Sequence, residues 1–388
     1  MKRMTVAALL ILVLLSLCLV SESSAIPAFA RRYKISCNTC HSPFPRLKPY
    51  GDEFAGNGFI IKEDEKERDY ISAGDEMLWL NKDFPIAVRF DAYAVYDQND
   101  DQQVKKDIES IYGLKLLSGG TVYKNVGYYF YFFMNERGEI AGVEDAYLHF
   151  DNLFGTPLDL LVGQFQTCDP LMKRELRLTF EDYAIYGARF GNSVTNLTYD
   201  RGVILTYGIE KTGTDLLATI VNGNGIGESG DDEKFDSDDY KNYGLRVKQG
   251  IGEMLSIGAF YYRGKERQSD IDNKITYIGP DVNITAGPFQ FTGQYLERKD
   301  SNALFAPGTA ELKSKGMVAE LVFSPQLDRS RYYITGLYNK IDSDDYKYET
   351  ATISGTYQLA RNLRIMAEYT RDLQHDFNRV TMGLVSGF

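Results

Sequence analysis

Apolar and polar residues alternate along most of the chain beyond residue 84. In the stretch 86–94, Ile86, Val88 and Phe90 alternate with Arg89 and Asp91. A period of two places apolar side chains on one face of a strand and polar side chains on the other. We read sixteen such strands, near 84–96, 107–118, 122–134, 143–150, 158–166, 201–210, 214–222, 241–249, 255–263, 275–283, 288–298, 316–324, 330–340, 348–359, 362–371 and 379–388.

The connections between these strands alternate between long and short. The connection 223–242 is long and acidic, for example, whereas the next one, 250–254, is a tight turn. The chain also ends on an apolar face with a terminal aromatic, Phe388. A soluble β-sandwich would show the same alternation of residues, but long outer loops and short periplasmic turns are typical of outer-membrane barrels. The sequence therefore predicts an all-β, transmembrane antiparallel β-barrel of about 16 strands over residues 83–388.

The first 25 residues have the pattern of a secretory signal peptide. Lys2 and Arg3 precede the apolar run 6–20, and Ser23-Ser24-Ala25 offers a cleavage site. This apolar run is shorter than the roughly 20 residues of a spanning helix. We therefore expect residues 1–25 to be removed and the mature chain to be exported.

Composition narrows the function classes. The net charge of −11 argues against nucleic acid as a partner, and few cysteines remain for disulfides in an exported chain of this size. There are 28 tyrosines and 22 phenylalanines but one tryptophan. An aromatic load of this kind suits a barrel with aromatic girdles in outer-membrane lipid.

Residues 26–82 precede the barrel and carry the motif C-x-x-C-H, formed by Cys37, Cys40 and His41. This spacing suits two thioether bonds to one haem c, with His41 as the proximal ligand of the iron. A disulfide, a redox pair and half of a zinc site are the alternatives. A zinc site would need further ligands nearby, and a thioredoxin-like pair would need a βαβ context. We therefore predict one covalently bound haem.

The residues around the motif suit a haem pocket. Aromatic side chains that could pack on the porphyrin are Phe44, Tyr50, Phe54 and Phe59, and cations that could neutralise its propionates are Arg31, Arg32, Arg46 and Lys48. The stretch 62–69 is a charged linker to the first strand.

The segment 26–59 resembles the haem-attachment region of outer-membrane monohaem c-type cytochromes of metal-respiring bacteria, which join such a head to a porin-like barrel. The stretch "LLVGQFQ", residues 160–166, is similar to a strand motif of phosphate-selective porins. Together these resemblances imply a haem-carrying barrel with a redox or channel role.

A second iron ligand is predicted from topology. With a periplasmic N-terminus, the fourth strand ends near Phe150 at the periplasmic mouth, and His149 faces the lumen there. His149 is therefore a candidate distal ligand, although an ordinary lumen residue is an equal alternative. Met77 and Met172 are the methionine candidates, and His375 falls in an outer loop.

The connection 167–200 is the third outer loop and is too long for a plain hairpin. By its position it resembles the loop that constricts general porins. The charged residues of this loop would then form a constriction of the pore. The alternative is that they form a solvated amphipathic turn. These charged residues are Lys173, Arg174, Glu175, Arg177, Glu181 and Asp182.

Two function classes follow from these features. The first is an electron-transfer cytochrome without enzymatic activity, in the cell outer membrane, with its haem segment on the periplasmic side or in the lumen. Since one haem cannot span a membrane band of about 25 Å, this function needs periplasmic or extracellular cytochromes as partners. The second is a porin-like channel for small anions or solutes, with the haem segment as a plug or redox gate. A haem peroxidase is a weaker third class, and a homo-oligomer is left open.

Overall fold

The structure is a computed structural model that describes residues 28–61, 84–99, 103–167 and 172–388. The predicted signal peptide (1–25), the charged linker (62–69), Met77 and Cys168 lie outside the described residues. Among the helices within these ranges, none is long and apolar enough to cross a membrane.

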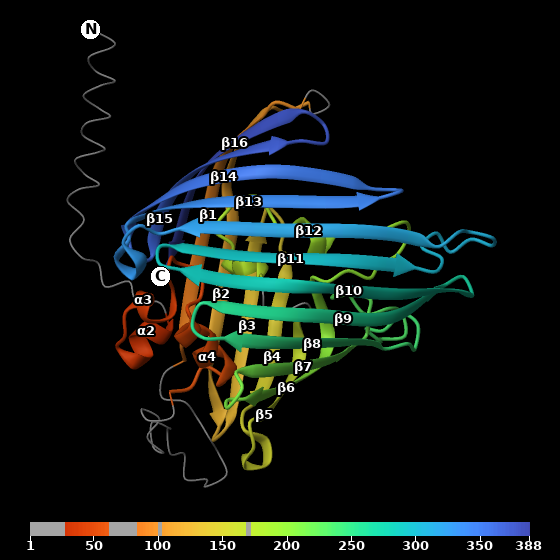
Figure 1. The fold of residues 1–388 in the computed structure, drawn as a ribbon, viewed down its shortest axis with the longest axis horizontal. Helices are drawn as coiled ribbons and strands as arrows, with labels where there is room; N and C mark the ends of the chain where they lie inside the picture. Colours follow the sequence, from red (N-terminus) through yellow and green to blue (C-terminus); the bar gives the residue numbers. More distant parts are fainter. Residues whose placement is uncertain (1–27, 62–83, 100–102, 168–171) are drawn as a thin grey trace.

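Sixteen antiparallel strands form a closed barrel in which each strand pairs with its neighbours in sequence (Figure 1). The first and last strands close it, with Arg89 opposite Gly387. The strands are β1 (Ile86–Asp97), β2 (Lys106–Tyr123), β3 (Val126–Glu136), β4 (Gly142–Phe150), β5 (Leu158–Gln166), β6 (Tyr199–Ile209), β7 (Thr214–Val221), β8 (Asn242–Ile251), β9 (Leu255–Gln268), β10 (Ile271–Ala286), β11 (Phe289–Asp300), β12 (Leu312–Phe323), β13 (Tyr332–Ser343), β14 (Lys347–Ala360), β15 (Leu363–Asp372) and β16 (Phe377–Gly387). The predicted fold class and strand number are confirmed.

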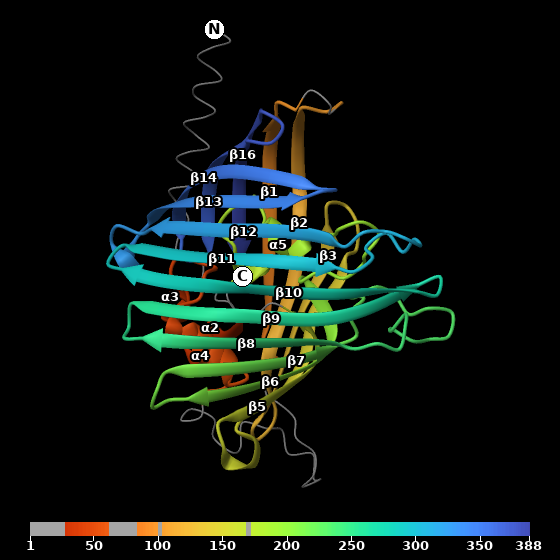
Figure 2. The same cartoon turned by 45° about the vertical axis from the view of Figure 1, so that its right-hand side comes forward.

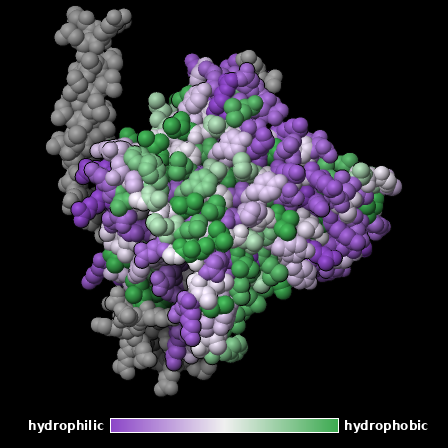
Figure 3. Space-filling model, in the orientation of Figure 1, coloured by the Kyte–Doolittle hydropathy of each residue, from purple (hydrophilic) through white to green (hydrophobic). Residues whose placement is uncertain are grey.

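The barrel wall has a polar inner face and an apolar outer face. On β1, Arg89 and Asp91 are buried inside, whereas Ile86 on the opposite face is exposed. On β8 and β10, Leu245 and Ile278 are more than half exposed on the outside. Figure 3 shows hydrophobic residues gathered across the middle of the wall, between hydrophilic residues at both ends. This is the distribution expected of a wall that faces lipid.

The two ends of the barrel differ in the length of their connections. At one end the turns are short, as at 210–213 and 252–254. At the other end the connections are long, as at 222–241 and 301–311. For β8–β13, which run across Figures 1 and 2, the short turns lie on the left and the longer connections on the right. Tight turns also occur at this second end, as at 269–270 and 344–346. The predicted alternation of loop lengths is therefore confirmed only in part: the long loops share one end, but not every connection at that end is long.

The N-terminal segment, residues 28–61, covers the end with the short turns. It contains α2 (Ala28–Tyr33), α3 (Cys37–Cys40) and α4 (Pro49–Gly56), which lie beside this end in both ribbon views (Figures 1 and 2). The Arg31 guanidinium donates to the carbonyl of Ile86, the first residue of β1. We call residues 28–61 the plug segment.

The third loop, between β5 and β6, enters the barrel. The backbone N–H of Glu181 donates to Glu368 on β15 at 2.9 Å, and that of Ala184 donates to Asn339 on β13 at 3.1 Å. The hydroxyl of Tyr186 donates to Gln294 on β11 at 2.6 Å. The loop contains η2 (Arg174–Leu176) and α5 (Ala184–Gly187). It therefore reaches the inner wall on the side of β11–β15, as its resemblance to constricting loops implied.

The packing of this loop is more apolar than its charges suggested. Aromatic and aliphatic residues of the loop pack against inward-facing residues of β9–β13 in one buried cluster. Its loop members include Tyr183, Ile185, Tyr186, Phe190 and Leu197, and its wall members include Phe260, Tyr262, Tyr277, Leu296 and Leu337. The charged half of the loop faces the other strands, where Lys173 lies 3.5 Å from Asp145 on β4 and Arg174 pairs with Asp182 at 2.6 Å.

Candidate haem-attachment site

The two cysteines of the motif lie on a single helical turn. This turn, α3, begins at Cys37 and ends at Cys40, and the backbone N–H of His41 closes it by donating to the Cys37 carbonyl at 2.9 Å. Both cysteines are free thiols. Burial raises the pKa of each thiol, so both are protonated at neutral pH. The motif therefore presents two thiols and an imidazole within five residues.

The loop after α3 folds back and orients the imidazole of His41. The backbone N–H of Arg46 donates to the Pro43 carbonyl at 2.8 Å, and that of Lys48 donates to the Cys40 carbonyl at 2.8 Å. This closure brings the carbonyl oxygen of Pro45 to 2.6 Å from Nδ1 of His41. Since a carbonyl only accepts, Nδ1 carries the proton and donates, which leaves the lone pair on Nε2.

The tautomer of His41 is the one that an iron ligand needs. A ligating histidine commonly donates its second ring N–H to a carbonyl, which fixes the ring and raises its basicity. Burial also lowers the pKa of His41, so its neutral form predominates at neutral pH. The ring of Phe44 lies edge-on to the imidazole at a centroid distance of 5.2 Å.

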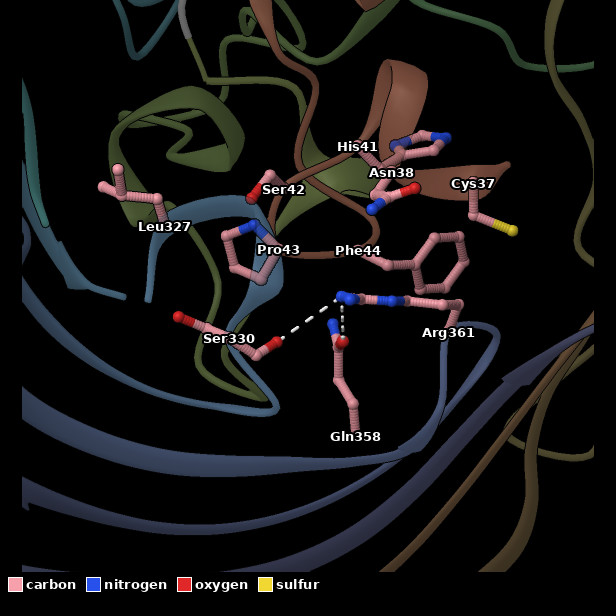
Figure 4. A pocket seen from close by; sticks show the side chains of 10 residues that line it. All are labelled: Cys37, Asn38, His41, Ser42, Pro43, Phe44, Leu327, Ser330, Gln358 and Arg361. Carbon is pink, nitrogen blue, oxygen red and sulfur yellow. Dashed lines mark hydrogen bonds between the residues drawn. The ribbon is translucent and has the colours of Figure 1, made fainter. Parts of the chain in front are cut away.

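The motif opens onto a pocket between the plug segment and the barrel (Figure 4). The plug segment contributes Cys37, Asn38, His41, Ser42, Pro43 and Phe44, and the barrel contributes Leu327, Ser330, Gln358 and Arg361. The barrel residues come from β14 and from the short turns that follow β12 and β14. Of the two thiols, Cys37 lines this pocket, and Cys40 is buried at the other end of the same helical turn. One thiol at the pocket, a second on the same turn, an oriented neutral imidazole and an aromatic ring fit a covalently bound haem.

Two of the four cations expected to neutralise propionates instead dock the plug segment on the barrel. Arg46 forms an ion pair with Glu320 on β12 and donates to Thr292 on β11 at 2.7 Å. Lys48 forms an ion pair with Asp328 in the turn after β12. Arg31 donates to a backbone carbonyl, and Arg32 lies over the ring of Tyr33 at 5.4 Å.

The aromatic residues of the plug segment also divide into two groups. Phe44 lies beside His41, as expected for a haem pocket. Phe54 and Phe59 pack together with Phe29, and Phe59 stacks on Tyr129 of β3 at 4.8 Å. These two phenylalanines therefore anchor the segment on the wall. Tyr50 is 42% exposed.

The structure places His149 inside the barrel but does not bring it to the pocket of His41. His149 is 6% exposed on β4, and its Nδ1 lies near Gly58, where the segment approaches β3 closely. A Cβ on Gly127 of β3 would lie 2.4 Å from the Gly58 carbonyl oxygen. His41 instead lines its pocket together with the turn after β14. Distal ligation by His149 stays a prediction.

The other candidate ligands lie elsewhere. Met172 is 4% exposed within the buried cluster of the third loop. His375 lies in the turn between β15 and β16, at the end with the long loops, beside Asp372 at 3.2 Å. His375 is therefore at the end of the barrel opposite the plug segment, as the topology predicted.

Sequence reasoning missed three residues of the site. The first is Pro45, whose carbonyl sets the tautomer of His41. Arg361 and Glu320 are distant in sequence and meet the plug segment only because the barrel closes around it. The spacing His-x-x-x-Pro was the one available signal for Pro45, and no local signal marked the other two.

Comparisons with known proteins support the barrel. No protein-family model matches the chain, and no curated protein matches its sequence. Among solved structures, a loop L8 deletion mutant of OmpT, an outer-membrane protein of Vibrio cholerae, matches with a TM-score of 0.56 and 13% identity over 79% of this chain and 99% of that chain. An anion-selective porin from Comamonas acidovorans gives the same values. The trimer form of Vibrio cholerae OmpT matches with a TM-score of 0.55 and 12% identity over 79% and 99%.

These identities are low, so the likeness is one of fold. It covers about four-fifths of this chain and nearly the whole of each porin. The chain has the sixteen-stranded β-barrel fold of outer-membrane porins.

Proposed function

We propose that this protein is an outer-membrane cytochrome in which a porin-fold barrel holds one haem c at its plug segment. Cys37 and Cys40 would hold the porphyrin through thioether bonds, and Nε2 of His41 would ligate the iron. The bound group would supply one-electron chemistry through ferrous and ferric iron. The observation that carries this proposal is the bond from His41 Nδ1 to the Pro45 carbonyl, directly after the two-cysteine turn.

The chain's own residues would keep this site in one geometry. The Pro45 carbonyl holds the imidazole with Nε2 available, and Phe44 packs against the ring. The ion pairs of Arg46 and Lys48 fix the segment to β12 and to the turn that follows it. A ligand held in this way needs little rearrangement when the iron changes charge.

The position of the plug segment implies partners. It lies at the end with the short turns, which in outer-membrane barrels is the periplasmic end. The membrane band is about 25 Å thick, so a single iron at one end cannot carry electrons to the other end alone. We therefore propose that periplasmic or extracellular cytochromes exchange electrons with this protein, and that the protein is not itself an enzyme.

Covalent haem attachment is the first test. The full chain is expressed with a periplasmic haem-attachment system, and the purified outer-membrane fraction is stained for haem after denaturing electrophoresis. The parent protein should retain haem, with a reduced-minus-oxidised c-type spectrum, whereas Cys37→Ser/Cys40→Ser should lose it. The matched control is Cys168→Ser, which should keep both signals. An unstained parent protein in a membrane fraction that stains other c-type cytochromes would refute the proposal.

The same spectra test distal ligation by His149. If His149 ligates the iron, His149→Ala should lose or change the low-spin band of the reduced-minus-oxidised spectrum. An unchanged spectrum would refute this ligand.

A solute channel is the second candidate function. It is favoured by the likeness to porins, including one described as anion-selective, and by the polar inner wall of the barrel. In that case the plug segment would act as a plug or redox gate for small anions or solutes. Conductance in planar bilayers without reduction of an acceptor across liposomes would favour the channel, and reduction that depends on an added multihaem cytochrome would favour electron transfer.

An oligomer is also proposed. One of the matching OmpT structures is described as a trimer, and exposed apolar residues cover the outer wall of this barrel. A homo-oligomer within the membrane is consistent with both candidate functions.

A further inference from the structure

We propose that Arg361, in the turn between β14 and β15, binds a carboxylate of the group attached at Cys37 and Cys40, and so ties that group to the barrel wall. The carboxylate is a haem propionate if the proposed function is correct, and this inference rests on that function. The sequence predicted propionate contacts from cations of the plug segment, whereas this inference assigns one of them to the barrel.

The position of Arg361 is the first argument. Its side chain lines the same pocket as Cys37 and His41, although it lies more than 300 residues further along the chain. In Figure 4 the guanidinium reaches into this pocket from the barrel side, beneath the ring of Phe44. Its charge acts on the Cys37 thiol, where it opposes the effect of burial on the pKa.

The hydrogen bonds of Arg361 are the second argument. Within the described ranges its guanidinium donates to the backbone carbonyls of Asp328 and Ser330 at 3.2 and 3.5 Å, and to Oε1 of Gln358 at 3.3 Å. These acceptors are neutral, and all three contacts start from one nitrogen at long distances. A guanidinium has five donors in a planar fork that matches a carboxylate. Arg361 therefore keeps the capacity for a bidentate anionic partner.

The engagement of the other cations is the third argument. Arg46 and Lys48 are each paired with a barrel carboxylate, Glu320 and Asp328. If a propionate bound Arg46 or Lys48 instead, the barrel carboxylate now paired with that cation would lose its partner. The contact from Arg361 requires no such loss, so it is the better partner for an anion in this pocket.

Two consequences follow for the bound group. A fixed positive charge beside the porphyrin stabilises ferrous over ferric iron, because the ferrous form carries one positive charge fewer. The same charge keeps the propionate ionised to lower pH. Replacing Arg361 by a neutral residue should therefore lower the reduction potential and move the propionate titration to higher pH.

The test is a redox titration of the haem-loaded, detergent-solubilised full chain between pH 5 and pH 9. Arg361→Gln should lower the equilibrium constant for reduction about tenfold, which is a shift of about 59 mV for one electron. Arg329→Gln is the matched control, because Arg329 is exposed in the turn after β12 and its side chain does not line the pocket. It removes the same charge at the same end of the barrel and should leave the potential near that of the parent.

The outcomes separate this inference from the proposed function. A parent protein without covalent haem would refute the function itself. Haem present with equal potentials in Arg361→Gln and Arg329→Gln would overturn only the role of Arg361. If Arg361→Gln does not assemble, Arg361→Lys decides. Arg361→Lys keeps the positive charge but lacks the planar guanidinium. The pH at which propionate titration changes the reduction potential should therefore rise, and an unchanged value of this pH would overturn the inference.

Discussion

The imidazole of His41 shows how a few contacts prepare a side chain for a metal. Its Nδ1 is held by one backbone carbonyl, and its pKa is lowered because the ring is withdrawn from water. The lowered pKa means that the docked plug segment binds a proton less readily than the undocked segment. Linkage then requires docking to weaken as the pH falls through the usual range of a histidine.

Docking of the haem-free plug segment should therefore depend on pH. In Cys37→Ser/Cys40→Ser, trypsin should cleave the segment after Arg46 increasingly as the pH falls below about 6.5, the ordinary pKa of histidine. The weakening should stop once the pH passes the lowered pKa of the docked state. The measurement is the cleavage rate in detergent at a series of pH values, corrected with a peptide substrate.

The control for this prediction removes the titrating group. Adding His41→Gln to the same background should flatten the dependence between pH 5 and pH 7. An equal pH dependence with and without His41 would assign the effect to other groups, such as the ion pair of Lys48 with Asp328.

At the scale of elements, Glu320 joins three parts of the protein. It lies on β12, three residues before the strand ends at Phe323, which places it about 10 Å inside the barrel at about 3.4 Å per residue. Its Oε1 pairs with Arg46 of the plug segment, and its Oε2 accepts from the hydroxyl of Tyr183 in the third loop at 2.9 Å. The plug segment and the constricting loop are therefore coupled through one carboxylate.

Replacing this carboxylate should release the plug segment. Glu320→Gln loses the charge that pairs with Arg46, and a hydrogen bond to a charged group contributes about 1.5–3 kcal/mol. Faster tryptic cleavage of the segment and larger conductance steps in planar bilayers are expected. Glu349→Gln is the matched control, because Glu349 pairs with Lys340 at 2.9 Å on the outer face. Equal conductance and cleavage in both variants would exclude the coupling.

The strands were largely predictable, because each of them carries its own alternation of polar and apolar residues. β5 lies over Leu158–Gln166, the range predicted from the sequence. The errors concern strand ends. At the end with the short turns, β2 continues to Tyr123, although the sequence suggested 118. At the end with the long loops, β9 continues to Gln268 and β10 begins at Ile271, although the sequence suggested 263 and 275. These ends of β9 and β10 extend beyond the apolar band, where polar residues on both faces remove the alternation.

The candidate site was predictable only where it is contiguous. Cys37, Cys40 and His41 form one motif, so their spacing predicts their chemistry. Arg361 and Glu320 join the site through closure of the barrel and carry no local signal. The third loop was located by its length. Its burial in an aromatic cluster depends on inward-facing residues of β9–β13, and a period of two assigns these residues to one face of a strand without showing what they contact.

At the scale of the whole molecule, the barrel has two unlike ends. The plug segment closes the end with the short turns, and the third loop occupies the bore from the other end. An electron carried by the proposed haem would therefore enter or leave at the plug end. Which side of the membrane this end faces decides whether its partner is periplasmic or extracellular.

Cysteine labelling on intact cells tests this orientation. Asp232 lies in the long loop between β7 and β8, and Glu253 lies in the short turn between β8 and β9; both are exposed acidic residues. In a Cys168→Ser background, a membrane-impermeant maleimide should label Asp232→Cys on intact cells but label Glu253→Cys only after the outer membrane is opened. This pattern would place the haem pocket on the periplasmic side and make a periplasmic cytochrome its direct partner. Labelling of Glu253→Cys on intact cells would reverse the orientation, because short turns and plug segment share one end, and the direct partner would then have to be extracellular.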